Sequence, residues 1–240
     1  MSKATTIFRP DIQAMRGIAV LSVVLFHFRE NIFSTGYLGV DVFFVISGFV
    51  VTPLIIRIFK THNSNRNIPQ NLFAFYRRRF YRLAPAMGAT LGFSAFLIFL
   101  VGNINDLERF SKQGLATLLL IGNFGANEYS GNYFSPNPNP LIHMWSLSLE
   151  EQIYLAMPLI MYFALKRTKV CDEVQKVGRI LVFLLVTSGL LFAFPQILDP
   201  LWARLEILDS SAINFYSPFT RVWQFSLGGL IYLFPRKPLP

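Results

Sequence analysis

Long apolar runs, separated by basic segments, are the feature that most constrains what this chain can fold into. They cover residues 12–28, 37–56, 83–101, 141–165, 180–198 and 219–234. A helix of about 20 apolar residues crosses a hydrocarbon core of about 30 Å, and most of these runs approach that length. The pattern predicts an all-α integral membrane protein, a multi-helix transmembrane bundle with about six or seven membrane segments.

The composition excludes several other classes of protein. The chain is 53% hydrophobic and only 15% charged, whereas a soluble domain carries about 25% charged residues. That excludes an ordinary cytosolic enzyme, a disordered tail and a secreted disulfide scaffold. Cys171 is the only cysteine, so an intrachain disulfide and an all-cysteine metal site are impossible. No Walker loop, G-x-S-x-G elbow or H-E-x-x-H pattern occurs, so we expect no metal site, and no basic-aromatic face indicates nucleic-acid binding.

The basic residues predict how the chain is oriented in the membrane. Residues 57–82 hold seven Lys and Arg and no acid, so the positive-inside rule predicts that this segment and the N-terminus are cytoplasmic. A signal peptide is the alternative for the first run, but its small-residue cleavage pattern is missing. The sequence thus predicts a multi-pass protein of the plasma (inner) membrane.

Two later parts of this topology depend on short elements. The third helix is predicted at about 83–101, with Pro85 near its start. A second basic segment follows residue 165, and it is cytoplasmic if the short apolar piece at 115–121 re-enters the membrane or lies at its interface. The alternative is a span that starts near Leu107.

The first predicted helix carries two ionisable residues, Arg16 and His27. They are 11 residues apart, which in an α-helix is about 1100° and about 16 Å, so they lie along one stripe. Ionisable groups in apolar helices are functional candidates, and His suits proton transfer near neutral pH. The alternatives are an interfacial His27 and a snorkelling Arg16.

Two further charged features lie in the next motifs. Asp41 sits a few residues into an apolar helix, where an Arg or His on a neighbouring helix would satisfy it; the alternative is a carboxylate favoured by the helix dipole. Arg79 and Arg82 share a helix face, and two guanidinium groups on one face suit phosphate recognition. The alternative is a topology signal or contact with anionic lipid headgroups.

Residues 143–154 form the densest polar cluster. If a helix begins at Pro140, with Asn139 as its cap, one face carries His143, Ser146, Glu150 and Tyr154. Glu151 lies about 100° away. Two carboxylates beside a His could perform acid–base chemistry or relay protons. The alternative is a capping box of Ser148 and Glu151 for a helix that starts there.

Four motifs in order, at 9–21, 36–49, 75–85 and 139–154, resemble the acyltransferase 3 family of membrane acyltransferases. The resemblance implies a fold of about ten transmembrane helices. Residues 1–240 are therefore expected to be the N-terminal portion of such a membrane domain, incomplete at the C-terminus. The resemblance further implies a cytoplasmic acyl-CoA donor. It also implies transfer of the acyl group to a hydroxyl of an extracytoplasmic glycan or lipid-linked saccharide.

The resemblance also assigns roles to individual residues. His27 is expected to be catalytic, as a general base or as a brief acyl carrier, with Arg16 supporting it. Glu150 and Glu151 are expected to line the site or to orient the histidine. The expected substrate-binding residues are Arg79 and Arg82, at the donor phosphates, together with Asp41, His143, Trp145 and Ser146. Gln224 stands where a Glu is common in a later segment of the family.

The expected function is therefore a membrane O-acyltransferase that moves an acyl group, expected to be acetyl, from acyl-CoA to a carbohydrate acceptor. Acyl-CoA is a substrate here, and no bound cofactor is expected. The partners are the donor, the acceptor and the lipid bilayer. The alternatives are a proton-coupled transporter, whose intramembrane His, Asp and Glu would form a path, and a non-catalytic membrane fragment.

Overall fold

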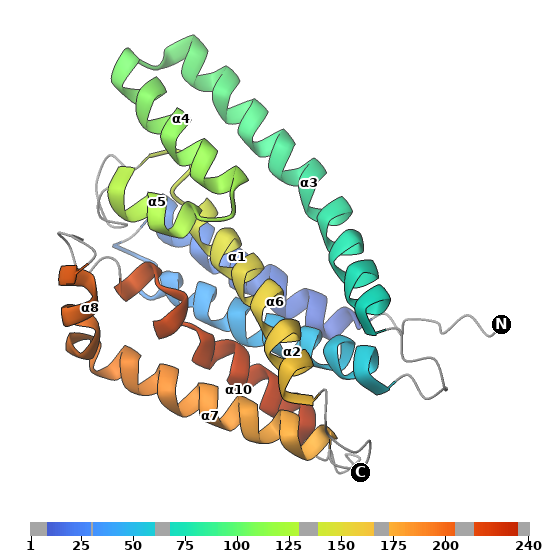
Figure 1. The fold of residues 1–240 in the computed structure, drawn as a ribbon. Coiled ribbons are helices and arrows are strands. Elements are labelled where there is room, and N and C mark those ends of the chain that lie inside the picture. The colour runs from blue at the N-terminus through green and yellow to red at the C-terminus, as the bar shows by residue number, and fades with distance from the viewer. Residues whose placement is uncertain are drawn as a thin grey trace.

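The computed structural model describes residues 9–29, 31–60, 68–129, 139–165, 173–204 and 214–234. Within these ranges the chain is a bundle of helices without a strand (Figure 1). Its elements are α1 (Pro10–Phe28), η1 (Gly36–Leu38), α2 (Gly39–Lys60), α3 (Ile68–Val101), α4 (Ile104–Leu118), α5 (Gly122–Tyr129), α6 (Met144–Leu165), α7 (Glu173–Ala193), η3 (Pro195–Leu198), α8 (Asp199–Arg204), η4 (Pro218–Thr220) and α10 (Val222–Leu233). The all-α prediction is confirmed.

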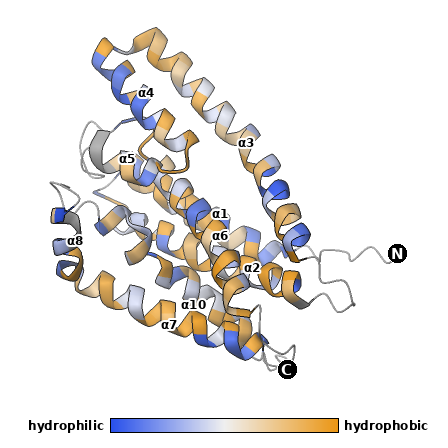
Figure 2. Ribbon diagram, viewed as in Figure 1, coloured by the Kyte–Doolittle hydropathy of each residue, from blue (hydrophilic) through white to orange (hydrophobic). Residues whose placement is uncertain are grey.

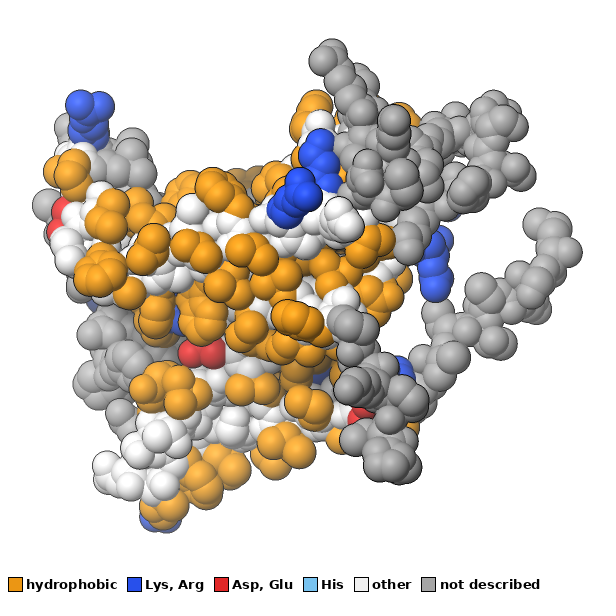
Figure 3. All heavy atoms as spheres, turned by 90° about the horizontal axis from the view of Figure 1, so that it is seen from below, with side chains coloured by type: hydrophobic (Ala, Val, Ile, Leu, Met, Phe, Trp, Pro, Cys, Tyr) orange, Lys and Arg blue, Asp and Glu red, His pale blue; other side chains and the backbone are white. Residues whose placement is uncertain are grey.

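Four helices of the described chain are long and apolar enough to cross a membrane: α1, α2, α3 and α7. Hydrophobic residues predominate along these helices, as the hydropathy colours of Figure 2 show, and hydrophobic side chains cover much of the face in Figure 3. Phe99 and Phe163 are more than 70% exposed, which in water would be costly but in lipid is not. These four helices indicate a membrane protein. The total of six or seven membrane segments stays a prediction.

The third membrane helix begins earlier than the hydropathy pattern predicts. It starts at Ile68, so Pro85 lies inside α3 and not near its start, and the prediction of a loop up to residue 82 was wrong. Arg has a high helix propensity, so the basic segment continues the helix beyond its apolar part. Proline is tolerated in membrane helices because neighbouring groups satisfy the freed backbone.

The short apolar piece at 115–121 covers the end of α4 and the turn that leads to α5. α4 begins with a capping box, in which Asn103 and Asp106 satisfy each other's backbone N–H groups. It ends at Leu118, and Leu120 takes a left-handed φ of 58° before α5 begins. Neither helix is among the four that could span a membrane, in agreement with the preferred topology.

The two ends of the bundle differ. One end, named the basic end here, holds the end of α2, the start of α3 and the start of α7; α4, α5 and α8 lie at the opposite end (Figure 1). Arg77, Arg78 and Arg79 lie about three turns after the start of α3, in the part of the helix nearer the basic end. The positive-inside rule predicts that the basic end is cytoplasmic.

Glycines bring α2 and α10 into close contact. A Cβ on Gly48 would meet the backbone of Phe225, and a Cβ on Gly228 would meet the carbonyl oxygen of Val45. The rings of Phe44 and Phe225 stack beside this crossing, with centroids 5.0 Å apart. Small residues at a helix crossing allow such backbone approach in membranes, so α2 and α10 depend on their glycines.

We therefore expect Gly228→Ala to destabilise the bundle by about 1–3 kcal/mol, because the methyl group overpacks the crossing. Gly92→Ala is the matched control, since a Cβ there meets nothing within 4 Å. The measurement is the midpoint of thermal unfolding in detergent. Equal midpoints for the two variants would show that the crossing does not need its glycines.

Candidate active site

Charged residues from three motifs meet around a cavity of about 240 Å³ between α1, α2, α3 and α6. The charged side chains that line it are Arg16, Arg79, Arg82, Glu150 and Glu151. We name this set the arginine–glutamate cluster. It joins residues that the sequence spreads over more than 130 positions, and all five are expected site residues.

Arg79 is held tightly within the arginine–glutamate cluster. Its Nε and Nη2 donate to the two carboxylate oxygens of Glu151, at 2.7 and 2.6 Å, and its guanidinium lies 3.2 Å from the centre of the Tyr154 ring. Bidentate pairs of this kind fix geometry as well as charge. Arg79 therefore serves first to place the carboxylate of Glu151.

Glu150 is buried beside that pair. Ser47 donates a hydrogen bond of 2.7 Å to its Oε1, and Nη2 of Arg79 lies 3.9 Å from the same oxygen. Burying two neighbouring carboxyl groups is costly, and the hydrogen bonds from the hydroxyl of Ser47 and the guanidinium of Arg79 offset part of that cost. The expected role of both acids in lining the site agrees with this position.

Arg16 and Arg82 are held less tightly than Arg79. The guanidinium of Arg16 lies 4.7 Å from the centre of the Phe43 ring, and Arg82 is exposed. In the part of the chain that the structure describes, neither forms an ion pair with a carboxylate. Three arginines against two glutamates leave the cavity with excess positive charge, so these two guanidinium groups can still bind an anion such as phosphate.

Asp41 has the cationic partner that its position predicts. Nη1 of Arg221 and Nε2 of Gln224 donate to its Oδ1, at 2.8 and 2.9 Å. Arg221 is buried and also donates from Nε to the carbonyl oxygen of Phe215. Arg221 lies outside the four motifs, and its only signal in the sequence is its position as an arginine near the start of an apolar run. A substrate-binding role for Asp41 stays a prediction.

Removing one partner of this pair should be costly, because it leaves the other charge buried. We expect Arg221→Gln to destabilise the protein by about 3–5 kcal/mol, and the double variant with Asp41→Asn to recover part of that loss. The free energy of unfolding in detergent measures both. Glu108→Gln breaks an exposed pair with Lys112 and should cost at most about 1 kcal/mol. A double variant no better than the single one would contradict this account.

The two expected histidines lie away from the arginine–glutamate cluster. His27 is in the last turn of α1, exposed, with Nδ1 2.8 Å from the carbonyl oxygen of Val23. A carbonyl only accepts, so Nδ1 donates and the neutral ring keeps Nε2 as its proton acceptor. Arg16 and His27 are on one helix as predicted, about 16 Å apart along its axis. In the described chain, the partners of Glu150 and Glu151 are Ser47 and Arg79.

His143 lies near His27, in the turn before α6. The carbonyl oxygen of Pro140 accepts a hydrogen bond from its ring, and the pKa of His143 is lowered mainly by desolvation, with a smaller effect of the neighbouring His27. A lowered pKa favours the neutral ring at pH 7. One nitrogen of that ring donates to Pro140, so the other is an acceptor.

The remaining residues of this motif have local roles. Trp145 is buried against Phe44 and Tyr216, and Ser146 donates to the carbonyl oxygen of His143. α6 begins at Met144 and not at Pro140, because Asn139 caps a turn by accepting from the N–H of Leu141. Ser148 is inside α6, so the alternative capping box is wrong. Substrate contacts of Trp145 and Ser146 stay predictions.

Comparison with known proteins agrees with the motifs. A family model described as an acyltransferase domain, that of the acyltransferase 3 family, matches residues 9–240. The O-acetyltransferase OatA of Staphylococcus aureus strain NCTC 8325 is 32% identical over 189 residues, which is 77% of this chain and 29% of that protein.

A putative O-acetyltransferase of S. aureus strain MRSA252 is 33% identical over 155 residues, 64% of this chain and 25% of that protein. The chain thus spans less than a third of the length of these relatives. No solved structure matches. Since the family model covers nearly all of its residues, this chain belongs to the acyltransferase 3 family of membrane acyltransferases.

Proposed function

We propose that this chain is the membrane-embedded catalytic part of an O-acetyltransferase of the plasma (inner) membrane. It moves an acetyl group from acetyl-CoA, bound from the basic end, to a hydroxyl of an extracytoplasmic carbohydrate. The observation that carries the proposal is the arginine–glutamate cluster, one member of which, Arg16, lies on the same helix as His27. The names of the S. aureus relatives support acetyl as the acyl group.

The donor would bind by its phosphates at the arginine–glutamate cluster. Arg16 and Arg82 supply guanidinium groups without a carboxylate partner in the described chain, and Arg79 holds Glu151 in place. The phosphates of CoA are separated from its thioester by the long pantetheine arm. An arm that runs along α1 would carry the thioester from Arg16 toward His27, about 16 Å away.

His27 would act as general base at the thioester. Its Nε2 takes the proton of the acceptor hydroxyl while the oxygen attacks the carbonyl carbon. The resulting tetrahedral adduct breaks its C–S bond, and the proton passes from His27 to the departing sulfur. The products are an acetyl ester on the acceptor and free CoA. The hydrogen bond from Nδ1 to the Val23 carbonyl keeps the ring in the tautomer that this step requires.

The test is transfer of radiolabelled acetyl from acetyl-CoA to a neutral tetrasaccharide by the purified protein in detergent or vesicles. Label that becomes ester-linked, and that mild alkali releases, supports the proposal. Proton-coupled saccharide flux in vesicles without any ester would favour the transporter alternative and contradict an acetyltransferase.

A further inference from the structure

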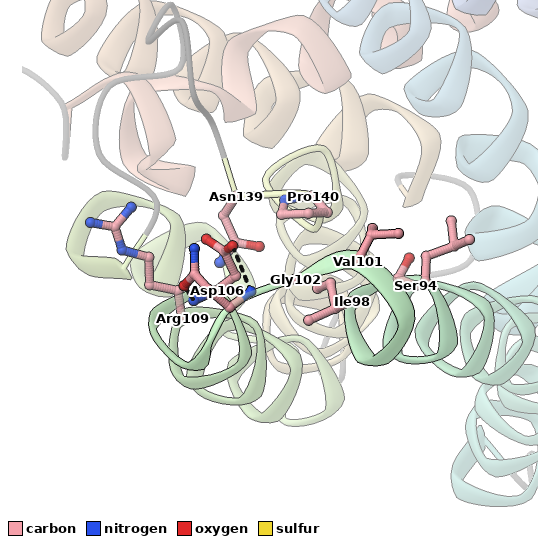
Figure 4. Close-up of a pocket in the computed structure, with 10 residues that line it drawn as sticks. Ser94, Ile98, Val101, Gly102, Asp106, Arg109, Asn139 and Pro140 are labelled. Atoms are coloured by element: carbon pink, nitrogen blue, oxygen red, sulfur yellow. Dashed lines mark hydrogen bonds between the residues drawn. The ribbon is translucent and has the colours of Figure 1, made fainter.

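A second and larger cavity, of about 680 Å³, lies at the opposite end of the bundle from the basic end. It is formed where α3 ends, α4 begins and the chain enters the turn before α6 (Figure 4). We name it the outer cavity; its lining includes Ile98, Val101, Asp106, Arg109, Asn139 and Pro140. The volume is within the range of about 300–1,000 Å³ that small-ligand sites occupy.

One side chain of the outer cavity carries an unused hydrogen-bond donor. Asn139 is 5% exposed, and its Oδ1 accepts from the N–H of Leu141. Its Nδ2 has no hydrogen-bond partner in the described chain. A buried donor without a partner costs about 1–3 kcal/mol, so a ligand oxygen at this position would relieve a cost that the empty cavity bears.

Two charges of opposite sign complete the polar side of the outer cavity. Asp106 accepts from the N–H of Asn103 through Oδ2, and no hydrogen bond engages its Oδ1 within the described residues. Arg109 is exposed and pairs with no carboxylate there. A phosphate only accepts hydrogen bonds, and Asp106 would repel it. A hydroxyl both donates and accepts, so it can satisfy Asp106, Arg109 and Asn139 together.

The other side of the outer cavity is apolar. Ile98 and Val101 come from the last turns of α3, as Figure 4 shows. A pyranose ring offers the complementary arrangement, with an apolar face of C–H groups and a rim of hydroxyls. The apolar side and the polar side of the outer cavity together therefore fit a neutral saccharide unit better than an anion or an acyl chain.

The outer cavity also adjoins the histidines. Pro140 lines it, and the carbonyl oxygen of Pro140 accepts the hydrogen bond from His143, which lies near His27. From Arg79 to Val101, α3 rises about 33 Å, which is about the thickness of the hydrocarbon core. A ligand in the outer cavity would thus lie toward the far side of the membrane from the arginine–glutamate cluster, beside the turn that carries His143.

We propose that the outer cavity is the acceptor subsite, which binds a neutral saccharide unit through Asp106, Arg109 and Asn139. This proposal rests on the proposed function, because an acetyltransferase needs a site for its acceptor. The structural observations on the outer cavity are separate from those on the arginine–glutamate cluster. The proposal assigns to α4 a task in choosing the acceptor, and it places the acceptor hydroxyl on the Pro140 side, toward the histidines.

The test measures saccharide binding without any donor. The probes are neutral tetrasaccharides of glucose, mannose and N-acetylglucosamine, titrated calorimetrically into the purified full chain. Asp106→Asn retains an oxygen for the capping box, and Arg109→Ala removes the guanidinium. Their matched controls on the same helix are Glu108→Gln and Lys112→Ala, which change the exposed pair outside the cavity. Thermal midpoints establish that all four variants are folded.

We expect at least one tetrasaccharide to bind, with its dissociation constant raised tenfold or more by Asp106→Asn and by Arg109→Ala, and unchanged in the two controls. The affinity for acetyl-CoA should be the same in all four. Absence of binding by every tetrasaccharide, or equal weakening in the controls, would overturn the proposal. The proposal would also be overturned if Arg109→Ala weakened only the binding of phosphatidylglycerol vesicles. That result would identify a lipid headgroup site. Saccharide binding that follows the cavity variants in a protein without acetyl transfer would reject the proposed function alone.

Discussion

His27→Gln should lower acetyl transfer by about 10²–10⁴-fold, the usual contribution of a positioned general base. Glutamine retains a polar side chain of similar reach but takes no proton from an acceptor hydroxyl. His27 is exposed at the end of α1, and its hydrogen bond to Val23 stays within its own helix. Its loss should therefore leave the bundle folded and the donor bound.

The measurement is the single-turnover rate of acetyl transfer, with acetyl-CoA affinity and membrane insertion determined on the same preparation. His62→Gln is the matched control, because it removes the same residue type from the basic segment at 57–82. A wild-type rate in His27→Gln would remove this residue from the chemistry. An equal loss of donor affinity would instead indicate a binding role.

The helices were predictable because hydropathy reports which residues face lipid, and a polypeptide in lipid must be helical. Their ends were not, because a helix continues wherever its backbone bonds can form. Arg77 and Arg82 are poor residues for lipid but good ones for a helix, so α3 extends into the basic segment. At α6 the opposite occurred, since the turn capped by Asn139 delays the helix to Met144.

The members of the candidate site were predictable from motifs, but their partners were not. Ion pairs between helices depend on rotation and crossing, which a single sequence does not specify. Arg79 and Glu151, 72 residues apart, each looked like a free ligand group, whereas the structure pairs them. The position of Asp41 predicted a cationic partner. That partner, Arg221, is 180 residues away and belongs to no recognised motif.

The outer cavity lay in the segment that hydropathy describes least well. Asn103 and Asp106 form a capping box. That local role accounts for both residue types, so the sequence alone does not indicate a second role. Only the packing of α4 against the end of α3 and the turn at Asn139 creates a space between them. Such a cavity follows from tertiary contacts and not from a motif.

Arg16→Ala combined with Arg82→Ala should abolish measurable donor binding. A charge-assisted hydrogen bond contributes about 1.5–3 kcal/mol, so the loss of one from each arginine raises the dissociation constant for acetyl-CoA by roughly 10²-fold or more. Arg78→Ala is the matched control, since it removes the same charge from an exposed position on α3 that does not line the cavity. An unchanged dissociation constant in the double variant would return both arginines to a topological role.

Arg79→Ala separates placement from binding within the same cluster. Its guanidinium already holds Glu151 and lies beside Glu150, so its removal leaves two buried carboxylates without their cation and should destabilise the protein by about 3–5 kcal/mol. Arg82→Ala removes an exposed side chain and should weaken the donor without lowering the thermal midpoint. Adding Glu151→Gln to Arg79→Ala should restore part of the stability, because it removes one of the two carboxylates left without their cation. If Arg79→Ala weakens acetyl-CoA at an unchanged thermal midpoint, then Arg79 binds phosphate directly and its pair with Glu151 opens when the donor arrives.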